Sequence, residues 1–270
     1  MKTAALYLLL AVSAATFLYP FLWMAATTFK PAVEVGTLGL VPDHPTLENY
    51  RRMWERAPVG RALLNSLAVA TTITLSVLVL GSVTAYALAR LHFPGRRLLI
   101  GTSVAALLVP GQLTLIPAYA LMVRLGWVDS YAALIVPYLF NVTAVLILRQ
   151  FFLQVPRSLL DAARLDGMGE LRIVFTVFWP LARPALATVA ILVFMGSWNE
   201  VLWPLLVIRQ ETLMTLPQLL TVFRMGGGAG PSGLAVQLAA SMVLVAPVLT
   251  AYVVLQRFFI ESMASTGTKG

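Results

Sequence analysis

Long apolar segments are the feature that most constrains this chain. A helix needs about 20 mainly apolar residues to cross the hydrocarbon core of a membrane, and six stretches of the sequence satisfy this requirement. They are residues 4–28, 63–91, 98–123, 131–151, 184–206 and 234–259. With 59% hydrophobic and only 11% charged residues, the composition excludes an ordinary water-soluble domain. The sequence therefore predicts an all-α membrane protein with six transmembrane helices.

The connections between the apolar segments are too short to fold as separate water-soluble domains. We therefore expect one membrane domain over residues 1–270, with its core at about residues 60–260. The first apolar segment follows Lys2 and has small residues at positions 12–14, as a cleaved signal peptide would. Its apolar character continues through Phe17 and Trp23 without a polar cleavage region, which favours a retained first span.

The positions of lysine and arginine predict the orientation of the spans, because these residues are enriched in cytoplasmic loops. With the N-terminus inside, eleven of the 19 basic residues lie on the inner side and eight on the outer side. Five of those eight belong to the first outer loop, and without this loop the contrast is eleven to three. We therefore expect both termini in the cytoplasm.

The net charge of +8 raises the question of an anionic partner. The basic residues are scattered through the loops that flank the membrane, and they form no stripe of the kind that binds nucleic acid. Anionic lipid headgroups are the better partner. The sequence has no cysteine, and its two histidines, His44 and His92, lie far apart without the spacing of metal ligands. We expect neither nucleic acid nor a metal.

Proline residues interrupt three of the predicted spans. Pro110 and Pro117 lie in the third span, Pro137 in the fourth and Pro247 in the sixth. Proline lacks a backbone N–H and clashes with the preceding turn, so these spans are expected to be kinked. Kinks of this kind suit a bundle that opens and closes, but they are also common in membrane proteins generally, and both interpretations stay open.

Two polar connections are expected on the outer side. Residues 30–62 contain turn signals and then an amphipathic stretch over residues 46–56, which predicts a short surface helix. This helix is either a contact for an external partner or a lid on the lipid headgroups. Residues 209–233 form the second connection. Its run Gly226–Gly228 is interpreted as a flexible linker, because no strand precedes it and no P-loop lysine follows it.

Glu200 is the only acidic residue well inside an apolar segment, and an ionisable group at membrane depth indicates function. Counted from Pro184 at about 1.5 Å per residue, Glu200 lies roughly 24 Å along a core of about 30 Å, near the outer mouth. It is either an interfacial carboxylate bonded to a neighbouring helix or part of the substrate path. No second buried acid or histidine is present for a proton relay, which argues against a proton-coupled carrier. The candidate residues of the translocation path are Asn65, Gln112, Asn141, Asn199 and Glu200.

Residues 156–184 form a polar, charged loop between two apolar segments. Pro156 ends the preceding helix, Ser158 is a candidate N-cap, and Asp161 follows three residues later, as in a capping box with aspartate in place of glutamate. This pattern predicts a helix of about eight residues. Gly167 is expected to end that helix in the left-handed conformation, which glycine adopts without strain.

Small residues and a second amphipathic helix complete this loop. Ala162 and Ala163 give the first helix a face on which another protein can approach closely. After the turn, Glu170 opens a second helix, and two prolines, Pro180 and Pro184, redirect the chain into the fifth span. The apolar residues that recur at helical spacing in the second helix are Leu171, Val174, Phe175 and Phe178. The result is a helix–turn–helix along the inner membrane face.

This loop resembles the EAA loop of ABC importer permeases, whose pattern is E-A-A, three residues, G, nine residues and I-x-L-P. The residues at matching positions are Asp161, Ala162, Ala163, Gly167 and Pro180. Val177 stands for the isoleucine and Trp179 for the leucine, while Asp161 is one methylene shorter than the glutamate. The resemblance implies that the matching residues couple this chain to an ATPase. For Asp161, capping alone is the other interpretation, and the two roles can coexist.

Further segments extend the resemblance over nearly the whole chain. They are Pro45–Tyr50, Leu63–Leu67, Ala85–Arg96, Trp198–Leu205 and the tail that starts with Gln256–Phe259. Taken in order and with six spans, they are similar to permeases of the carbohydrate-uptake branch of this family. The resemblance implies the fold of a type I ABC importer permease in a bacterial or archaeal inner membrane.

The same resemblance implies a permease subunit of an ATP-driven carbohydrate importer, which forms half of the translocation path. The implied partners are a second permease in a heterodimer, two cytoplasmic ABC ATPase subunits and an extracytoplasmic substrate-binding protein. The sequence has no GxxxxGK(S/T) motif, so we expect no enzyme activity and no cofactor in this chain, with ATP and Mg bound by the partner ATPase. Glycerol phosphate or another polyol is the alternative substrate class, and a stand-alone secondary carrier is the alternative mechanism.

Overall fold

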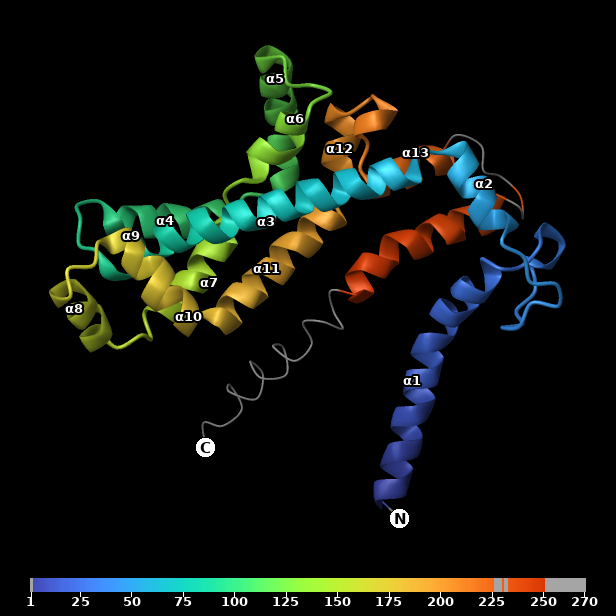
Figure 1. The fold of residues 1–270 in the computed structure, drawn as a ribbon, viewed down its shortest axis with the longest axis horizontal. Coiled ribbons are helices and arrows are strands. Elements are labelled where there is room, and N and C mark those ends of the chain that lie inside the picture. Colours follow the sequence, from blue (N-terminus) through green and yellow to red (C-terminus); the bar gives the residue numbers. More distant parts are fainter. Residues whose placement is uncertain (1, 226–229, 231–232, 251–270) are drawn as a thin grey trace. The chain divides into compact units, whose positions relative to one another are not determined.

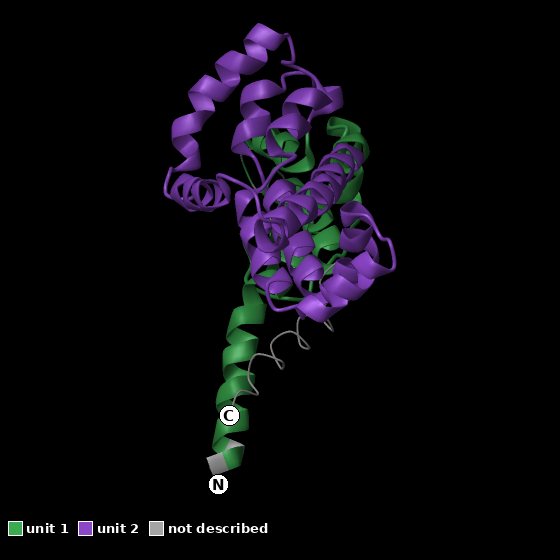
Figure 2. Cartoon of the chain, turned by 90° about the vertical axis from the view of Figure 1, so that its left-hand side faces the viewer, with its two compact units in different colours: residues 1–63, 215–249 green, residues 64–214, 250–270 purple. Residues whose placement is uncertain are grey.

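The computed structural model describes residues 2–225, 230 and 233–250, and within these ranges every secondary-structure element is helical (Figure 1). The chain divides into two compact units (Figure 2). Unit 1 consists of residues 1–63 and 215–249, and unit 2 consists of residues 64–214 and 250–270. Because every described element is helical, the predicted all-α fold is confirmed.

Four helices of the described residues are long and apolar enough to cross a membrane. They are Ala5–Thr27, Val59–Arg90, Tyr131–Phe152 and Gly233–Thr250. Two further pairs of helices qualify only when each pair is taken together. Arg96–Ala106 and Gly111–Leu125 meet at a bend of 97°, and Glu170–Leu181 and Arg183–Trp198 meet at a bend of 92°. If each bent pair counts as one span, the number is six, as predicted from the sequence.

Unit 1 holds the first span and the loop that follows it. Its elements are α1 (Lys2–Thr27), η1 (Ala32–Glu34), α2 (Glu48–Arg56), residues 59–63 of α3 (Val59–Arg90), α13 (Leu216–Met225) and most of helix Gly233–Thr250. The apolar window of α1 is entirely unburied within this chain, so its surface is available to lipid or to another subunit. The predicted surface helix over residues 46–56 is confirmed as α2.

A buried lysine organises the loop that follows α1 in unit 1. The side chain of Lys30 is fully buried, and its Nζ donates to the carbonyl oxygens of Thr37 at 3.0 Å and Gly39 at 2.6 Å. The Nδ2 of Asn49, on α2, donates to the carbonyl oxygens of Thr28 at 2.8 Å and Lys30 at 2.9 Å. Buried polar groups require such partners, so α2 is held against the end of α1 by specific hydrogen bonds.

Unit 2 contains most of α3 and the central helices. Its other elements are α4 (Arg96–Ala106), η2 (Gly111–Thr114), α5 (Leu115–Leu125), α6 (Tyr131–Ile135), η3 (Val136–Tyr138), α7 (Val142–Phe152), α8 (Arg157–Leu165), α9 (Glu170–Ile173), the π-helical η4 (Val174–Phe178), α10 (Trp179–Leu181), α11 (Arg183–Trp198), α12 (Leu202–Val207) and η5 (Glu211–Leu213). Three buried rings join α3, α7 and η4 in its core. Phe178 makes edge-to-face contacts with Tyr86 and with Phe152, each with ring centroids 5.0 Å apart.

The predicted third span, residues 98–123, is two helices rather than one kinked helix. Helix α4 ends at Ala106, four residues before Pro110. Proline cannot donate to the carbonyl four residues earlier and clashes with it, which explains why α4 stops there. Pro117 was expected to interrupt a helix, but it does not. It lies in the first turn of α5, where proline is tolerated.

The predicted fifth span, residues 184–206, is wrong in its second half. Helix α11 ends at Trp198, and a new helix, α12, begins at Leu202. Pro204 would clash with the carbonyl of Glu200 in a continuous helix, so the break falls before it. Glu200 is therefore at a helix break and not in a helix that continues to residue 206.

The connection over residues 209–233 is more ordered than its turn residues suggest. Residues 211–213 form η5 and Leu216–Met225 form α13, with Pro217 near the helix start. The proposed linker Gly226–Gly228 lies outside the described residues, as do residues 251–259 of the sixth span and the tail Gln256–Phe259.

Candidate functional site

The polar loop folds as the expected helix–turn–helix, although its first helix starts differently. Helix α8 begins at Arg157, and the N-cap position is occupied by Pro156, which makes no side-chain capping bond. Ser158 thus lies inside the first turn. The predicted capping box of Ser158 and Asp161 is wrong, because Pro156 in an extended conformation already sets the helix start.

Gly167 ends α8 as predicted, with a φ of +76°. The N–H of Met168 donates to the carbonyl of Ala163 and the N–H of Gly167 to the carbonyl of Arg164, each at 3.0 Å. These two bonds are those of a Schellman motif, which satisfies carbonyls at the end of a helix. A Cβ added at Gly167 would meet no atom within 4 Å, so the backbone conformation and not space requires glycine.

The two alanines of the EAA-like pattern face different ways. Ala163 is buried with Leu160 and anchors α8 to its own unit, whereas Ala162 is exposed. The expectation that both form an open small-residue face is therefore wrong. The exposed residues at spacing i, i+3, i+4 and i+7 on α8 are Ser158, Asp161, Ala162 and Leu165. Sequence reasoning missed Leu165, whose side chain is 89% exposed.

The second arm of the loop buries a different stripe than expected. Val174 and Phe178 are buried as predicted, but Leu171 and Phe175 are exposed. Ile173 joins the buried side. The π-helical hydrogen bonding of η4 shifts the helical spacing, so a regular α-helical pattern could not predict which apolar residues point inward.

Glu170 connects the two arms of the loop to α3. Its Oε1 accepts a hydrogen bond of 2.9 Å from Nε of Arg164 at the end of α8, and Nη2 of Arg164 lies at 2.9 Å from the same oxygen. Its Oε2 accepts a hydrogen bond from the hydroxyl of Tyr86 on α3. Burial opposes the charge of Arg164, but the hydrogen bond and the negative charge of Glu170 raise the pKa of Arg164 above its ordinary value.

The end of the second arm also contacts α3. The indole Nε1 of Trp179, which stands at the leucine position of the EAA pattern, donates to Oγ of Ser82 at 3.0 Å. Pro180 is exposed and lies in the first turn of α10, directly after Trp179. The loop and the neighbouring span α3 are thus joined at both ends of the second arm.

The five candidate path residues lie in different local settings. Gln112 is exposed in η2, and Asn141 caps α7 by accepting a bond of 2.9 Å from the N–H of Ala144. Asn199 is exposed, and its Nδ2 donates to the carbonyl of Met195 at 3.0 Å. Asn65 and Glu200 have hydrogen-bond partners of their own.

Asn65 is buried, and its amide group makes three hydrogen bonds within unit 2. Asn65 therefore joins α3 to Tyr131 and to residues 212–214. The Oε1 of Glu200 accepts a bond of 3.1 Å from the N–H of Trp203, in the first turn of α12. Its carboxylate thus stabilises the start of that helix, which agrees with a hydrogen-bonded interfacial group.

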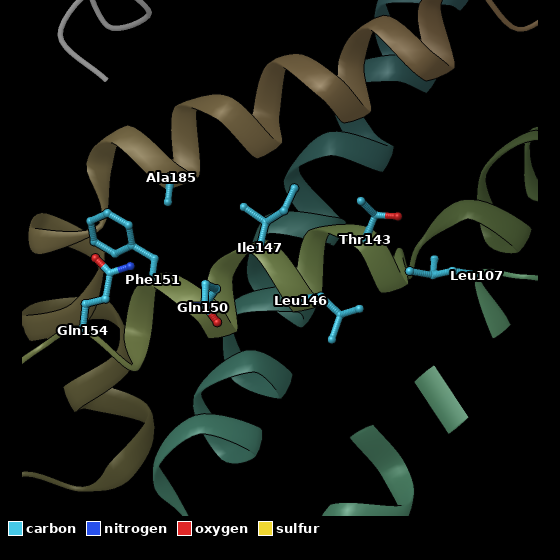
Figure 3. A pocket seen from close by; sticks show the side chains of 8 residues that line it. All are labelled: Leu107, Thr143, Leu146, Ile147, Gln150, Phe151, Gln154 and Ala185. Atoms are coloured by element: carbon cyan, nitrogen blue, oxygen red, sulfur yellow. The ribbon is translucent and has the colours of Figure 1, made fainter. Parts of the chain in front are cut away.

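A groove of about 440 Å³ lies along α7 (Figure 3). The residues that line it are Leu107, Thr143, Leu146, Ile147, Gln150, Phe151, Gln154 and Ala185. Three polar side chains of this lining are exposed: Thr143 and Gln150 on α7, and Gln154 two residues after the helix ends. Sequence reasoning missed them, although the spacing of seven residues between Thr143 and Gln150 places these two on one helix face.

Comparison with known proteins identifies the class of chain to which these features belong. Residues 63–263 match the family described as binding-protein-dependent transport system inner membrane component. The chain belongs to this family. It is a multi-pass permease subunit of an ABC importer and not an enzyme. Permeases of this class work with a partner permease, ATPases and a substrate-binding protein.

Three relatives show how far the similarity extends. The arabinooligosaccharides transport system permease protein AraQ of Halalkalibacterium halodurans is 32% identical over 93% of this chain and 91% of its own. The sn-glycerol-3-phosphate transport system permease protein UgpE of Escherichia coli strain K12 is 31% identical over 96% and 94%. The diacetylchitobiose uptake system permease protein NgcG of Streptomyces coelicolor is 34% identical over 92% and 83%.

The fold also matches a solved transporter. A chain of a bacterial ABC transporter involved in the import of the acidic polysaccharide alginate superposes with a TM-score of 0.85. The match covers 96% of each chain at 24% sequence identity. It confirms the predicted importer permease fold.

Proposed function

We propose that this permease forms half of the translocation path of an ATP-driven carbohydrate importer. The observation that carries the proposal is the exposed face of α8, which presents Asp161 and Ala162 at the positions of the EAA pattern. The helix is anchored from behind by Leu160 and Ala163 and ended by a Schellman motif. A short, anchored helix with an exposed face is suited to docking on another protein.

The proposed docking partner is a pair of cytoplasmic ABC ATPase subunits, which bind ATP and Mg. Within the described residues, Asp161 takes part in none of the salt bridges, so its carboxylate is open to a cation on a partner. Leu165, four residues later on the same face of α8, is 89% exposed. Protein interfaces combine an apolar core with a polar rim, and an exposed leucine near an exposed carboxylate offers both. The ATPase-coupling residues are Asp161, Ala162, Gly167 and Pro180. Ala163 supports them as a buried residue that packs α8 against its own unit.

The proposed orientation follows from this docking. If the loop contacts cytoplasmic ATPases, both termini lie in the cytoplasm, in agreement with the distribution of basic residues. The outer loop with α2 then faces the substrate-binding protein. A second, different permease would complete the path and cover the apolar surface of α1, which is unburied in this chain.

A polyhydroxylated substrate fits the polar groups proposed for the path. These residues are Gln112, Asn141, Thr143, Gln150, Gln154, Asn199 and Glu200. Amide groups donate and accept hydrogen bonds, as sugar hydroxyls do. The set includes one acid and no lysine or arginine, which favours a neutral carbohydrate over sn-glycerol 3-phosphate. Asn65 is left out, because its amide is already used within the chain.

The experiment is purification of the importer through a tag on this chain, followed by reconstitution with its binding protein. The expected complex contains a second permease and an ATPase, and the liganded binding protein stimulates ATP hydrolysis. The substrate is found from the melting temperature of the binding protein with arabinooligosaccharides, diacetylchitobiose or sn-glycerol 3-phosphate. Uptake by this chain without an ATPase would establish a stand-alone carrier instead, and a response to sn-glycerol 3-phosphate alone would exclude the carbohydrate.

A further inference from the structure

One face of α3 is joined to the helix–turn–helix loop at successive turns. Ser82, Tyr86 and Arg90 are spaced four residues apart, so they lie above one another on the same face of the helix. Ser82 and Tyr86 are buried at 0% and 2% exposure. Each of the three side chains contacts a part of the loop or the end of the helix that enters it.

Tyr86 makes the central contact. Its hydroxyl donates to Oε2 of Glu170, while its ring packs edge-to-face against Phe178 at a centroid distance of 5.0 Å. Because Glu170 also binds Arg164 at 2.9 Å, one carboxylate connects α8, α9 and α3. Tyr86 and Glu170 are 84 residues apart in sequence, so this link is independent of the chain connections of the loop.

Ser82 and Arg90 make the contacts on either side. Ser82 accepts a hydrogen bond of 3.0 Å from Trp179 at the end of the second arm. Arg90 donates to the carbonyl oxygens of Phe152 and Val155, which precede α8. Its guanidinium also lies 5.7 Å from the centre of the Phe178 ring. The loop is therefore attached to α3 at its entry, at its turn and at its exit.

We propose that Tyr86 and Glu170 are positioning residues that make α3 move with the docked loop. The inference rests on the proposed coupling to an ATPase. Covalent connections join the loop only to α7 before it and α11 after it. A displacement of α8 reaches α3 through side chains alone, and the hydrogen bonds of Glu170 carry it because they resist separation of its partly buried carboxylate from Tyr86. The ATPase thus drives three spans of this permease and not two.

The test measures whether α3 and the second arm move as one body. The natural chain has no cysteine, so spin labels can be attached at two introduced cysteines, Leu80→Cys on α3 and Leu171→Cys on α9. Both leucines are exposed, at 45% and 62%. The distance between the labels is measured in the full importer complex, first without nucleotide and then trapped with MgATP and vanadate.

With Tyr86 and Glu170 present, the distance is expected to be the same in both states. In Tyr86→Phe, which keeps the ring contact with Phe178, trapping should shift the distance by about 2 Å, the scale of helix displacements in such transitions. Adding Ser82→Ala should enlarge the shift. Glu170→Ala is a second way to break the link if Tyr86→Phe does not assemble. Tyr131→Phe removes a different tyrosine hydrogen bond in unit 2 and should behave as the parent.

Three outcomes overturn the inference. They are a distance that changes in the parent, a distance that stays constant in Tyr86→Phe and Glu170→Ala, and a shift of equal size in Tyr131→Phe. Failure of the proposed function looks different, because the tagged parent complex would then contain no ATPase and hydrolyse no ATP, whatever the label distances. A merely structural role of Tyr86 would lower the yield of the complex without making the distance depend on nucleotide.

Discussion

The hydroxyl of Tyr131 donates a hydrogen bond of 2.7 Å to Oδ1 of Asn65, which lies 66 residues earlier in the chain. The Nδ2 of Asn65 donates to the carbonyl oxygens of Thr212 at 3.0 Å and Met214 at 2.9 Å. One buried amide therefore joins α3, the start of α6, η5 and the residue that follows η5.

Replacing this amide should destabilise unit 2. Asn65→Leu leaves two backbone carbonyls and one phenol without their partner, and an unsatisfied buried polar group costs about 1–3 kcal/mol. Tyr131→Phe removes a single bond and should cost only about 0.5–1.5 kcal/mol. Thermal unfolding of the purified permease complex provides the comparison. Equal melting temperatures for Asn65→Leu and the parent would show that the hydrogen bonds do not stabilise this region.

The turn of the loop should tolerate substitution at one glycine and not at the other. Gly167 has a φ of +76°, where a residue with a Cβ costs about 1–2 kcal/mol. Gly169 has an ordinary φ of −71°, and a Cβ at either position would meet nothing within 4 Å. Gly167→Val should abolish uptake and ATPase coupling while leaving membrane insertion intact, and Gly167→Asn should be milder.

The matched control for the turn is Gly169→Ala. We expect normal uptake from this variant in the same reconstituted vesicles. Full activity in Gly167→Val, or an equal loss in Gly169→Ala, would contradict the role of the left-handed turn.

Asp161→Asn separates the charge of this residue from its size. Since no side chain caps the start of α8 among the described residues, loss of the Asp161 charge should act on docking alone. A hydrogen bond to a charged partner contributes about 1.5–3 kcal/mol, so ATPase binding should weaken roughly tenfold or more. Retention of the ATPase on the tagged permease measures the effect. Ser158→Ala should retain it, and the reverse pattern would make Asp161 a local helix residue.

Asp129 should make the loop before α6 sensitive to acid. This residue has a φ of 59°, and its Oδ1 accepts a bond from the N–H of Arg209 and a second, of 3.0 Å, from the N–H of Gln210. These hydrogen bonds hold the pKa of the Asp129 carboxyl below its ordinary value. The carboxylate therefore contributes stability above the unfolded pKa of about 3.9, and this contribution is lost as the pH falls through the lower folded pKa.

The variant Asp129→Asn keeps an acceptor and tolerates positive φ, but it does not titrate. Its melting temperature should lie below that of the parent at pH 7, and the difference should shrink below about pH 4. A difference that is independent of pH from 3 to 8 would mean that the charge of Asp129 has no part in holding the two loops together.

Local chemistry in the sequence was sufficient for several features. The six apolar segments predicted the all-α membrane fold, because a spanning helix needs a continuous apolar stretch that periodicity and composition reveal directly. Gly167 predicted a left-handed turn, and residues 46–56 predicted the surface helix α2. These features depend on residues close together in the chain.

Other features depended on contacts that no local pattern contains. Ala163 is buried and Ala162 is exposed, because packing against the rest of unit 2 selects the inner face of α8. The prediction of a continuous fifth span failed at Glu200, where the helix breaks. Pro204 could have indicated this break, because proline clashes with the carbonyl four residues earlier.

The sequence by itself determined the membrane class, the helix–turn–helix loop and the positions of its turn, since each follows from residues within a few turns of one another. Only the tertiary structure decided that Tyr86 donates a hydrogen bond to Glu170, that Trp179 donates to Ser82 and that Tyr131 donates to Asn65. Hydrogen bonds between residues more than 60 positions apart depend on how buried helices pack, and that packing is a property of the whole unit rather than of any segment.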